Sequence, residues 1–135
     1  MKEPIWLSRD DCLGIHEMML SQHGGLAGVR DGGLLLSALA KPQNRFAYGS
    51  TSPAEMAASH AAGIVLNHPF LDGNKRTGFM VAALFLELNG MAFGASEETV
   101  VQSTVALASG AVTESGYAEW LKKNCKKKRR LASSE

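Results

Sequence analysis

The sequence predicts an all-α fold in one domain. Leu and Ala, which favour helices, dominate the chain. Hydroxyl residues followed by acidic residues recur as helix-start signals, and no segment alternates apolar and polar residues long enough to predict a strand. The 135 residues can bury one core, and 45% hydrophobic with 20% charged residues is typical of a globular protein. We therefore expect a compact fold of about six helices.

Start and stop signals bound the first two predicted helices. Ser8, followed by acidic residues, begins a helix that Gly24 ends. A short second helix is expected from Asp31 through Ala40, and Pro42 should end it, because the residue before a proline disfavours helical geometry. The segment Lys41–Thr51 shows neither helical periodicity nor caps, so we expect an exposed loop or flap with short extended stretches.

Two apolar helices should form the centre of the fold. Ser52 and Glu55 match a capping box with proline at the first helical position, and the Ala-rich helix Pro53–Leu66 follows. The segment Asn67–Gly73 interrupts the helical pattern. The next helix, Asn74–Leu88, is apolar on nearly all sides, which predicts burial.

Two more helices and a basic segment complete the chain. Ser96 caps a helix that ends at Gly110, and a last helix runs from about Glu114 to Asn124. Residues 1–121 carry 7 basic and 12 acidic residues, a net charge of −5, whereas residues 122–135 carry 7 basic and one acidic residue. We expect residues 1–121 to form the domain and residues 122–135 a solvated basic tail, with contact to RNA or to an acidic partner surface as the alternative.

Composition argues against several classes of protein. The acidic body disfavours a domain whose main task is to bind nucleic acid. No apolar run approaches the ~20 residues that span a bilayer, and the first residues lack the apolar core of a signal peptide, so we expect a cytoplasmic protein with no membrane partner. Cys12 and Cys125 fit no metal-site spacing and are expected to be free thiols.

Polar and titratable residues gather between the two most apolar helices, in the segment HPFLDGNKRT, residues 68–77. Histidine titrates nearest to neutral pH of the common side chains, so His68 is a candidate general base. Asp72 is a hard oxygen ligand suited to Mg²⁺. The amides at the start of the following helix form an anion-binding nest, beside which Lys75 and Arg76 add positive charge. This combination predicts a phosphate-handling site.

Simpler interpretations of these residues stay open. A charged loop is often solvated surface, and Asp72 could merely pair with Arg76. Phe70 is expected to anchor the loop in the core under either interpretation. No P-loop and no GxGxxG motif is present, and the second ligand of a zinc-protease helix is missing. The other histidines are interpreted as packing or surface residues: His16, His23 and His60.

The segment HPFLDGNKRT resembles the signature of the Fic/Doc superfamily, HxFx(D/E)GNxRxxR in its nucleotidylating Fic members. Lys75 stands where those members usually have glycine, and Phe79 stands where they have the second arginine. Both departures are shared by the Doc, or death-on-curing, branch. The resemblance extends over nearly the whole body, from about Leu7 to Leu121. The matching residues are His68, Phe70, Asp72, Gly73, Asn74 and Arg76.

The resemblance implies a toxin of a bacterial toxin–antitoxin pair. Such a toxin transfers phosphate from ATP to a protein target, elongation factor Tu or a similar protein, and arrests translation. It implies that His68 activates the target hydroxyl and that Asp72 holds Mg²⁺. The residues implied to bind nucleotide phosphates are Gly73, Asn74, Lys75 and Arg76.

The resemblance also implies two protein-binding features. A flap that holds the target in extended form would consist of Gln43, Asn44, Arg45, Phe46, Ala47 and Tyr48. The inhibitory (S/T)xxxE(G/N) helix of many Fic proteins is absent, since no Glu is followed by Gly or Asn, so an antitoxin chain would supply the inhibition. Two alternatives remain: a Fic-type AMP transferase, and a catalytically degenerate domain that only binds a partner.

Overall fold

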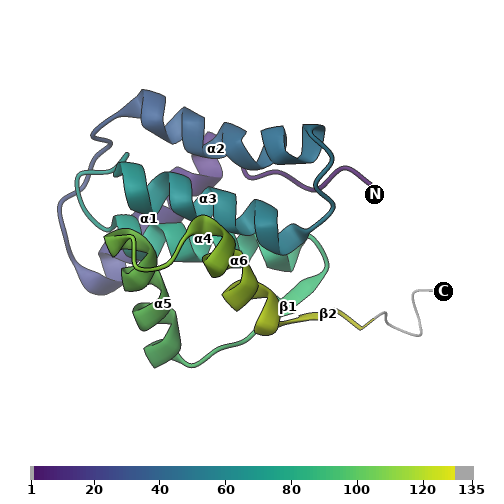
Figure 1. The fold of residues 1–135 in the computed structure, drawn as a ribbon. Helices are drawn as coiled ribbons and strands as arrows, with labels where there is room; N and C mark the ends of the chain where they lie inside the picture. The colour runs from purple at the N-terminus through teal and green to yellow at the C-terminus, as the bar shows by residue number, and fades with distance from the viewer. Residues whose placement is uncertain (1, 130–135) are drawn as a thin grey trace.

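Six helices and two short strands make up the part of the chain that the computed structural model describes, residues 2–129 (Figure 1). The all-α fold class is confirmed, since each strand has only three residues. In chain order the elements are α1 (Arg9–His23), α2 (Gly32–Ala47), α3 (Pro53–Asn67), α4 (Asn74–Leu88), β1 (Met91–Phe93), α5 (Glu97–Ser109), α6 (Glu114–Lys123) and β2 (Cys125–Lys127).

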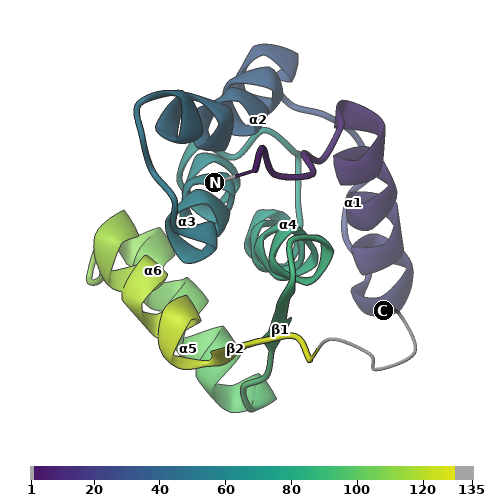
Figure 2. The ribbon, with the colours of Figure 1, turned by 90° about the vertical axis from the view of Figure 1, so that its right-hand side faces the viewer.

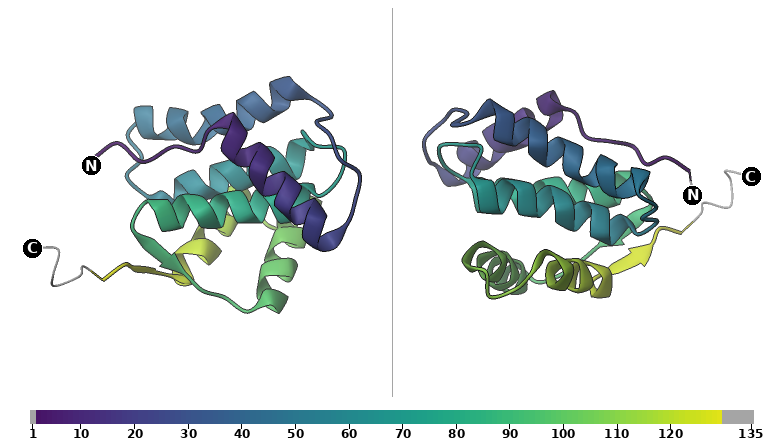
Figure 3. Two further views of the ribbon diagram at one scale, coloured as in Figure 1. Left: turned by 180° about the vertical axis from the view of Figure 1, so that it is seen from behind. Right: turned by 45° about the horizontal axis from the view of Figure 1, so that its top comes forward.

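Helices α3 and α4 lie in the middle, with α2 on one side of them and α5 and α6 on the opposite side (Figure 3, right), and α1 packs beside α4 (Figure 2). Figure 2 looks almost along α4 and shows the other helices around it. Two glycines allow close packing in the centre. A Cβ atom at Gly63 would lie 2.7 Å from the Cβ of Ala38, and one at Gly78 would lie 2.5 Å from a methyl group of Val65. The burial predicted for α3 and α4 is confirmed.

Local capping explains most helix boundaries. Ser8 and Asp11 form a reciprocal capping box at the start of α1. The hydroxyls of Ser52 and Ser96 accept hydrogen bonds from the third residue of α3 and α5, respectively. The predicted boundaries of α4 are confirmed at both ends, and α3 ends one residue later than predicted.

The prediction that Pro42 ends the second helix, and that a loop follows, is wrong. Helix α2 continues through Pro42 to Ala47. Proline removes one helical hydrogen bond, but tertiary contacts of the last turns compensate for it. Pro42 itself is buried, and Phe46 packs edge-on against Trp6 with ring centroids 5.9 Å apart.

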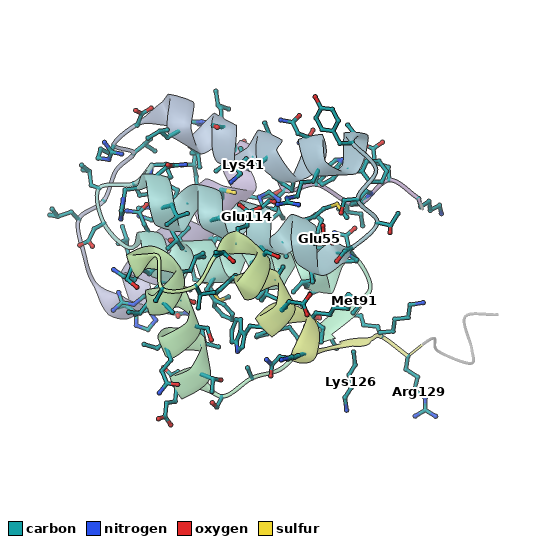
Figure 4. All side chains as sticks on the ribbon, viewed as in Figure 1. Lys41, Glu55, Met91, Glu114, Lys126 and Arg129 are labelled. Carbon is teal, nitrogen blue, oxygen red and sulfur yellow. The ribbon has the colours of Figure 1, made fainter. Side chains whose placement is uncertain are left out.

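An ionic cluster joins three helices at the carboxylate of Glu114, the first residue of α6 (Figure 4). Its oxygens accept hydrogen bonds from Lys41 Nζ at 2.9 Å, Arg45 Nη2 at 2.7 Å and Ser59 Oγ at 2.8 Å. Burial raises the pKa of Glu114, but the hydrogen bonds from these three side chains outweigh burial and hold the pKa below its usual value. The cluster therefore attaches α6 to α2 and α3.

Replacing Glu114 with glutamine should destabilise the protein by about 1–3 kcal/mol at pH 7, because two cations lose their charged acceptor. Because the folded-state pKa lies below the unfolded value, the contribution of Glu114 is present above the unfolded pKa of about 4.3 and is lost as the pH falls through the folded pKa. Urea unfolding of the wild type and of Glu114→Gln, at pH 7 and near pH 3.5, measures this contribution. If the difference in the free energy of unfolding between the two proteins stays constant between these pH values, the stabilising role of the Glu114 carboxylate is contradicted.

Strands β1 and β2 form an antiparallel pair that the sequence analysis did not predict. The register pairs Met91 with Lys127 and Phe93 with Cys125. The boundary expected after Leu121 thus falls inside α6, and the basic segment contributes a strand to the fold as far as Lys127. Figure 4 shows the side chains of Lys126 and Arg129 pointing away from the helices. Residues 130–135 of the expected tail lie outside the described residues.

The first and the last described segments both attach to the end of α4. The side chain of Asn89 bonds to the main chain of Ile5 in both directions, at 2.7 and 3.0 Å. The amide of Lys128 donates to the carbonyl of Gly90 at 2.9 Å, and its ammonium group lies 3.1 Å from Glu87. The first and last described segments therefore depend on the same helix terminus.

Two further expectations concern the cysteines and the membrane. Cys12 and Cys125 are free thiols, as predicted, and burial raises the pKa of Cys12 to about 12. Within residues 2–129, every helix is too short or too polar to cross a membrane.

Candidate functional site

The segment between α3 and α4 is fixed by main-chain bonds to the loop that joins α1 and α2. Val29 forms an isolated antiparallel bridge with Phe70, and the amide of Leu71 donates to the carbonyl of Gly28 at 3.0 Å. The amides of Arg30 and Asp31 both donate to the carbonyl of Pro69, at 2.7 and 3.0 Å. The predicted motif therefore has a defined shape, although it is formally a loop.

Phe70 occupies the position of a core anchor. Its side chain is fully buried, and its ring stacks on the imidazole of His16 in α1, with centroids 3.9 Å apart and planes 8° apart. The Nε2 atom of His16 lies 2.8 Å from the carbonyl oxygen of Asp72. His16, interpreted from sequence only as a packing or surface residue, thus also contacts the main chain of the motif.

His68 is the C-cap of α3 and has the left-handed conformation, with φ 51° and ψ 61°. Among residues 2–129 it is the single non-glycine residue with positive φ. Such a conformation costs about 1–2 kcal/mol in a residue other than glycine, and surrounding contacts must maintain it. The conformation ends α3 and leaves the imidazole exposed at the edge of a cavity.

Asp72 presents an exposed carboxylate that main-chain amides hold in place. Oδ2 accepts from the amide of Leu26 at 3.2 Å, and Oδ1 accepts from the amide of Gly73 at 2.9 Å. These two hydrogen bonds, with the positive charge of Arg76, hold the pKa of Asp72 below its usual value. Asp72 and Arg76, both described, do not form an ion pair within 4.0 Å, so simple pairing does not explain the carboxylate.

The start of α4 combines a helix N-terminus with two exposed cations. Gly73 is the N-cap with φ 76°, a conformation that glycine adopts at low cost. The first amides of a helix have no intrahelical partner, so this end carries partial positive charge. Lys75 and Arg76 follow in the first turn and are exposed. An anion would therefore be stabilised here by main-chain and side-chain groups together.

The side chain of Asn74 holds the loop instead of facing solvent. Its Oδ1 accepts from the amide of Phe70 at 3.1 Å, and its Nδ2 donates to the carbonyl of Phe70 at 3.0 Å. The residue is only 7% exposed. Any contact of Asn74 with a phosphate would thus be made by its main-chain amide.

A cavity of about 590 Å³ brings the predicted residues together. His68, Asp72 and the first turn of α4 line one side of it, and α5 lines another side with Val100, Val101 and Val105. Such a combination of a few polar groups with an apolar wall is typical of small-molecule sites. From the predicted set it contains His68, Asp72, Gly73, Asn74, Lys75 and Arg76, whereas Phe70 lies behind it in the core.

Sequence reasoning missed the α5 wall, His23 and Glu97, which also line the cavity. No local signal distinguishes these residues, because only the packing of α1 and α5 brings them to the motif. Of the other histidines, His60 is buried beside Phe85, and burial lowers its pKa to about 4, so it packs in the core as expected.

The segment Gln43–Tyr48 does not lie beside the motif. It forms the last turn and the cap of α2, and Arg45 in it pairs with Glu55 at the start of α3. Because α2 and α3 run antiparallel, this end is opposite to His68 at the end of α3 (Figure 1). The segment that does lie beside the motif is the loop from Gly24 to Asp31.

The fit of this site to a divalent cation rests on Asp72. Residues 2–129 contain no group of three or more His, Cys, Asp or Glu side chains arranged to bind a metal. Mg²⁺ commonly keeps several waters and uses one or two carboxylates together with substrate phosphates. The Asp72 carboxylate retains free lone pairs after its two hydrogen bonds and lies beside the anion nest, so the residues present fit a cation that arrives with phosphates.

Comparison with known proteins identifies the family. Residues 6–86 match the Fic/DOC family. The chain is 32% identical over 118 residues to "Protein kinase doc" of Escherichia phage P1. The aligned region covers 87% of this chain and 93% of that protein. The chain is 37% identical over 93 residues to "Toxin Doc" of Mycolicibacterium smegmatis, covering 67% of this chain and 68% of that protein. The chain therefore belongs to the Fic/Doc family and to its Doc branch.

Proposed function

We propose that this protein is a toxin that transfers the γ-phosphate of ATP to a hydroxyl group of a target protein. The observation that carries the proposal is that His68, Asp72 and the start of α4 line the same cavity. It combines a candidate base, a hard oxygen ligand and an anion nest with two cations. The printed name of the phage relative, a protein kinase, supports the same reaction class.

In the proposed reaction, the target oxygen forms a bond to the γ-phosphorus, and the bond from this phosphorus to the β–γ bridging oxygen breaks. His68 accepts the proton of the target hydroxyl, and ADP leaves with the electron pair of the broken bond. The amides and cations at the start of α4 hold the phosphate oxygens. A Mg²⁺ ion held by Asp72 would neutralise part of the phosphate charge.

The choice of the γ-phosphate rests on Lys75 and Phe79. Lys75 adds a cation at the nest, and Phe79 lines the cavity with its ring packed against Phe93, at a centroid distance of 5.5 Å. Position 79 therefore supplies no second arginine to hold the phosphates. The lysine at position 75 and the phenylalanine at position 79, where nucleotidylating Fic members have glycine and arginine, support a nucleotide orientation in which the γ-phosphorus lies next to His68.

Labelled ATP tests the transferred group. Incubation of the protein with bacterial lysate should transfer label from γ-labelled ATP to a protein and none from α-labelled ATP. We expect the labelled protein to be elongation factor Tu or a similar translation factor. Transfer from α-labelled ATP instead would make this protein an AMP transferase. No transfer from either, with no Mg²⁺-dependent ATP binding, would favour a domain that only binds a partner.

We further propose that the target docks on the loop Gly24–Asp31 instead of Gln43–Tyr48. This loop contacts the motif through the Val29–Phe70 bridge and through the bond from Leu26 to Asp72. An extended target segment that pairs with the loop would present its hydroxyl to His68.

A protein antitoxin fits the surface around the cavity. Leu26, Leu71, Val101 and Val105 remain exposed beside it, although they are large and apolar. A partner segment that folds onto these side chains would cover the cavity. Expression of this protein alone should therefore inhibit growth, and co-expression of the antitoxin should relieve the inhibition. Harmless expression of catalytically active protein without a partner would contradict this.

Replacing Asp72 with asparagine should weaken Mg²⁺-dependent ATP binding by about 10-fold, and excess Mg²⁺ should restore part of it. Asparagine keeps the shape of the side chain but not the charge. Calorimetric titration with ATP, with and without Mg²⁺, measures the effect. Asp10→Asn, on the exposed first turn of α1, is the control. Binding that is indifferent to Mg²⁺ in both wild-type and Asp72→Asn protein would assign Asp72 another role.

A further inference from the structure

The guanidinium group of Arg30 donates to the end of α3. Its Nε lies 2.6 Å from the carbonyl oxygen of His68, and its Nη2 lies 2.7 Å from the carbonyl oxygen of Asn67. The planar fork of an arginine suits two adjacent acceptors, which a lysine ammonium group cannot match in the same geometry. Arg30 therefore bonds to the main-chain carbonyls of the last residue of α3, Asn67, and of its C-cap, His68.

These bonds hold His68 in its left-handed conformation. A histidine with φ 51° is strained, and the surrounding structure must over-determine the conformation for it to persist. The amide of Arg30 donates to the carbonyl of Pro69 at 2.7 Å, so the main chain and side chain of one residue bond to three consecutive residues, Asn67 to Pro69, at the end of α3 and the start of the motif. Without the guanidinium group, the direction in which the His68 imidazole points would be less defined.

The charge of Arg30 matters for the same cavity. The carbonyl end of a helix carries partial negative charge, and the end of α3 lies beside the place where phosphates would bind. A cation bonded to the last carbonyls of α3 neutralises part of this charge. The end of α3 therefore repels the phosphates of a nucleotide bound at the start of α4 less strongly.

We infer that Arg30 is a positioning residue, which orients His68 for catalysis and shields bound nucleotide from the negative end of α3. The catalytic part of this inference rests on the proposed function. Arg30 does not line the cavity, and it lies on the loop proposed to dock the target. Target contacts with that loop would thus act directly on the residue that sets the conformation of His68.

Two substitutions distinguish the effect of the forked guanidinium geometry of Arg30 from the effect of its positive charge. In Arg30→Lys the charge stays but the fork is lost, so kcat should fall about 10-fold while the KM for ATP changes little. In Arg30→Met both are lost, so kcat should fall as far or further and the KM for ATP should rise about 3-fold. Arg9→Met, at the exposed start of α1, is the matched control and should change neither parameter.

Hydrogen exchange provides a readout that does not require activity. The Leu71 amide, bonded to Gly28 across the same loop, should exchange about 10-fold faster in Arg30→Met than in the wild type and the control. Carbon chemical shifts of His68 should move away from left-handed values in the same variant.

The outcomes distinguish this inference from the proposed function. If Arg30→Met lowers only the melting temperature, with kcat, Leu71 exchange and His68 shifts unchanged well below melting, the inference is overturned. If the wild-type protein transfers no group, the proposed function fails, and the exchange and shift measurements still decide the role of Arg30. Faster exchange with displaced His68 shifts supports it, and unchanged values overturn it.

Discussion

Replacing His68 with alanine should reduce the rate of phosphate transfer by ~10²-fold or more while the protein remains folded. The imidazole is exposed and lines the cavity, so its removal opens no hole in the core. The loss would reflect the missing acceptor for the proton of the target hydroxyl. Single-turnover transfer from γ-labelled ATP, with a thermal melt of the same sample, measures both effects.

Asparagine at position 68 is the matched variant. Alanine disfavours the left-handed conformation, whereas asparagine adopts it more readily than most residues. His68→Asn should therefore melt close to the wild type and still lose at least as much activity as His68→Ala. A transfer rate that either variant leaves unchanged would exclude His68 as the general base.

The second large effect is expected at Gly78, where α4 packs against α3. A Cβ atom there would lie 2.5 Å from a methyl group of Val65 and 3.2 Å from the carbonyl oxygen of Ala61. Because that oxygen belongs to the main chain and valine has few rotamers in a helix, neither neighbour moves easily. Gly78→Ala should destabilise the protein by about 1–3 kcal/mol, as overpacked cores do, and Gly78→Val by more.

Gly14 in α1 is the control, because a Cβ atom there meets no other atom within 4 Å. Gly14→Ala should stabilise the protein by about 0.5–1 kcal/mol, since alanine favours a helix interior more than glycine does. Urea unfolding of both variants measures the contrast. Combining Gly78→Ala with Val65→Ala should recover part of the stability, and equal effects of Gly14→Ala and Gly78→Ala would contradict steric conflict at the interface.

Elements whose boundaries depend on neighbouring residues could be predicted from the sequence. Helix α4 begins after Gly73 and ends before Asn89, and both signals are local. Helix α2 could not be predicted in full, because contacts with α3 and α6 outweigh the local effect of Pro42. The two strands were missed because three residues are too few for a periodic pattern, and β1 pairs with a segment more than thirty residues later.

In the candidate site, too, the features that depend on neighbouring residues could be predicted, whereas those that depend on distant segments could not. His68, Asp72 and the start of α4 are contiguous in sequence, and the structure brings them into one cavity. His16 and Arg30 come from distant segments, and only the folded chain shows their contacts with the motif. The orientation of the Asn74 side chain is likewise a result of folding, because its partner, Phe70, is fixed by burial.

The attachment of Ile5 to Asn89 and of Lys128 to Gly90 has a practical consequence for handling the protein. Helix α4 has 15 residues and spans about 22 Å, with the candidate site at its first turn and both attachments after its last turn. Ile5 and Lys128, which lead toward the two termini, are therefore held at the end of α4 remote from the cavity, and we expect a tag or partner fused at either terminus to leave the cavity accessible. Truncation before Cys125 would remove β2, the partner strand of β1, together with the bonds from Lys128 to Gly90 and Glu87.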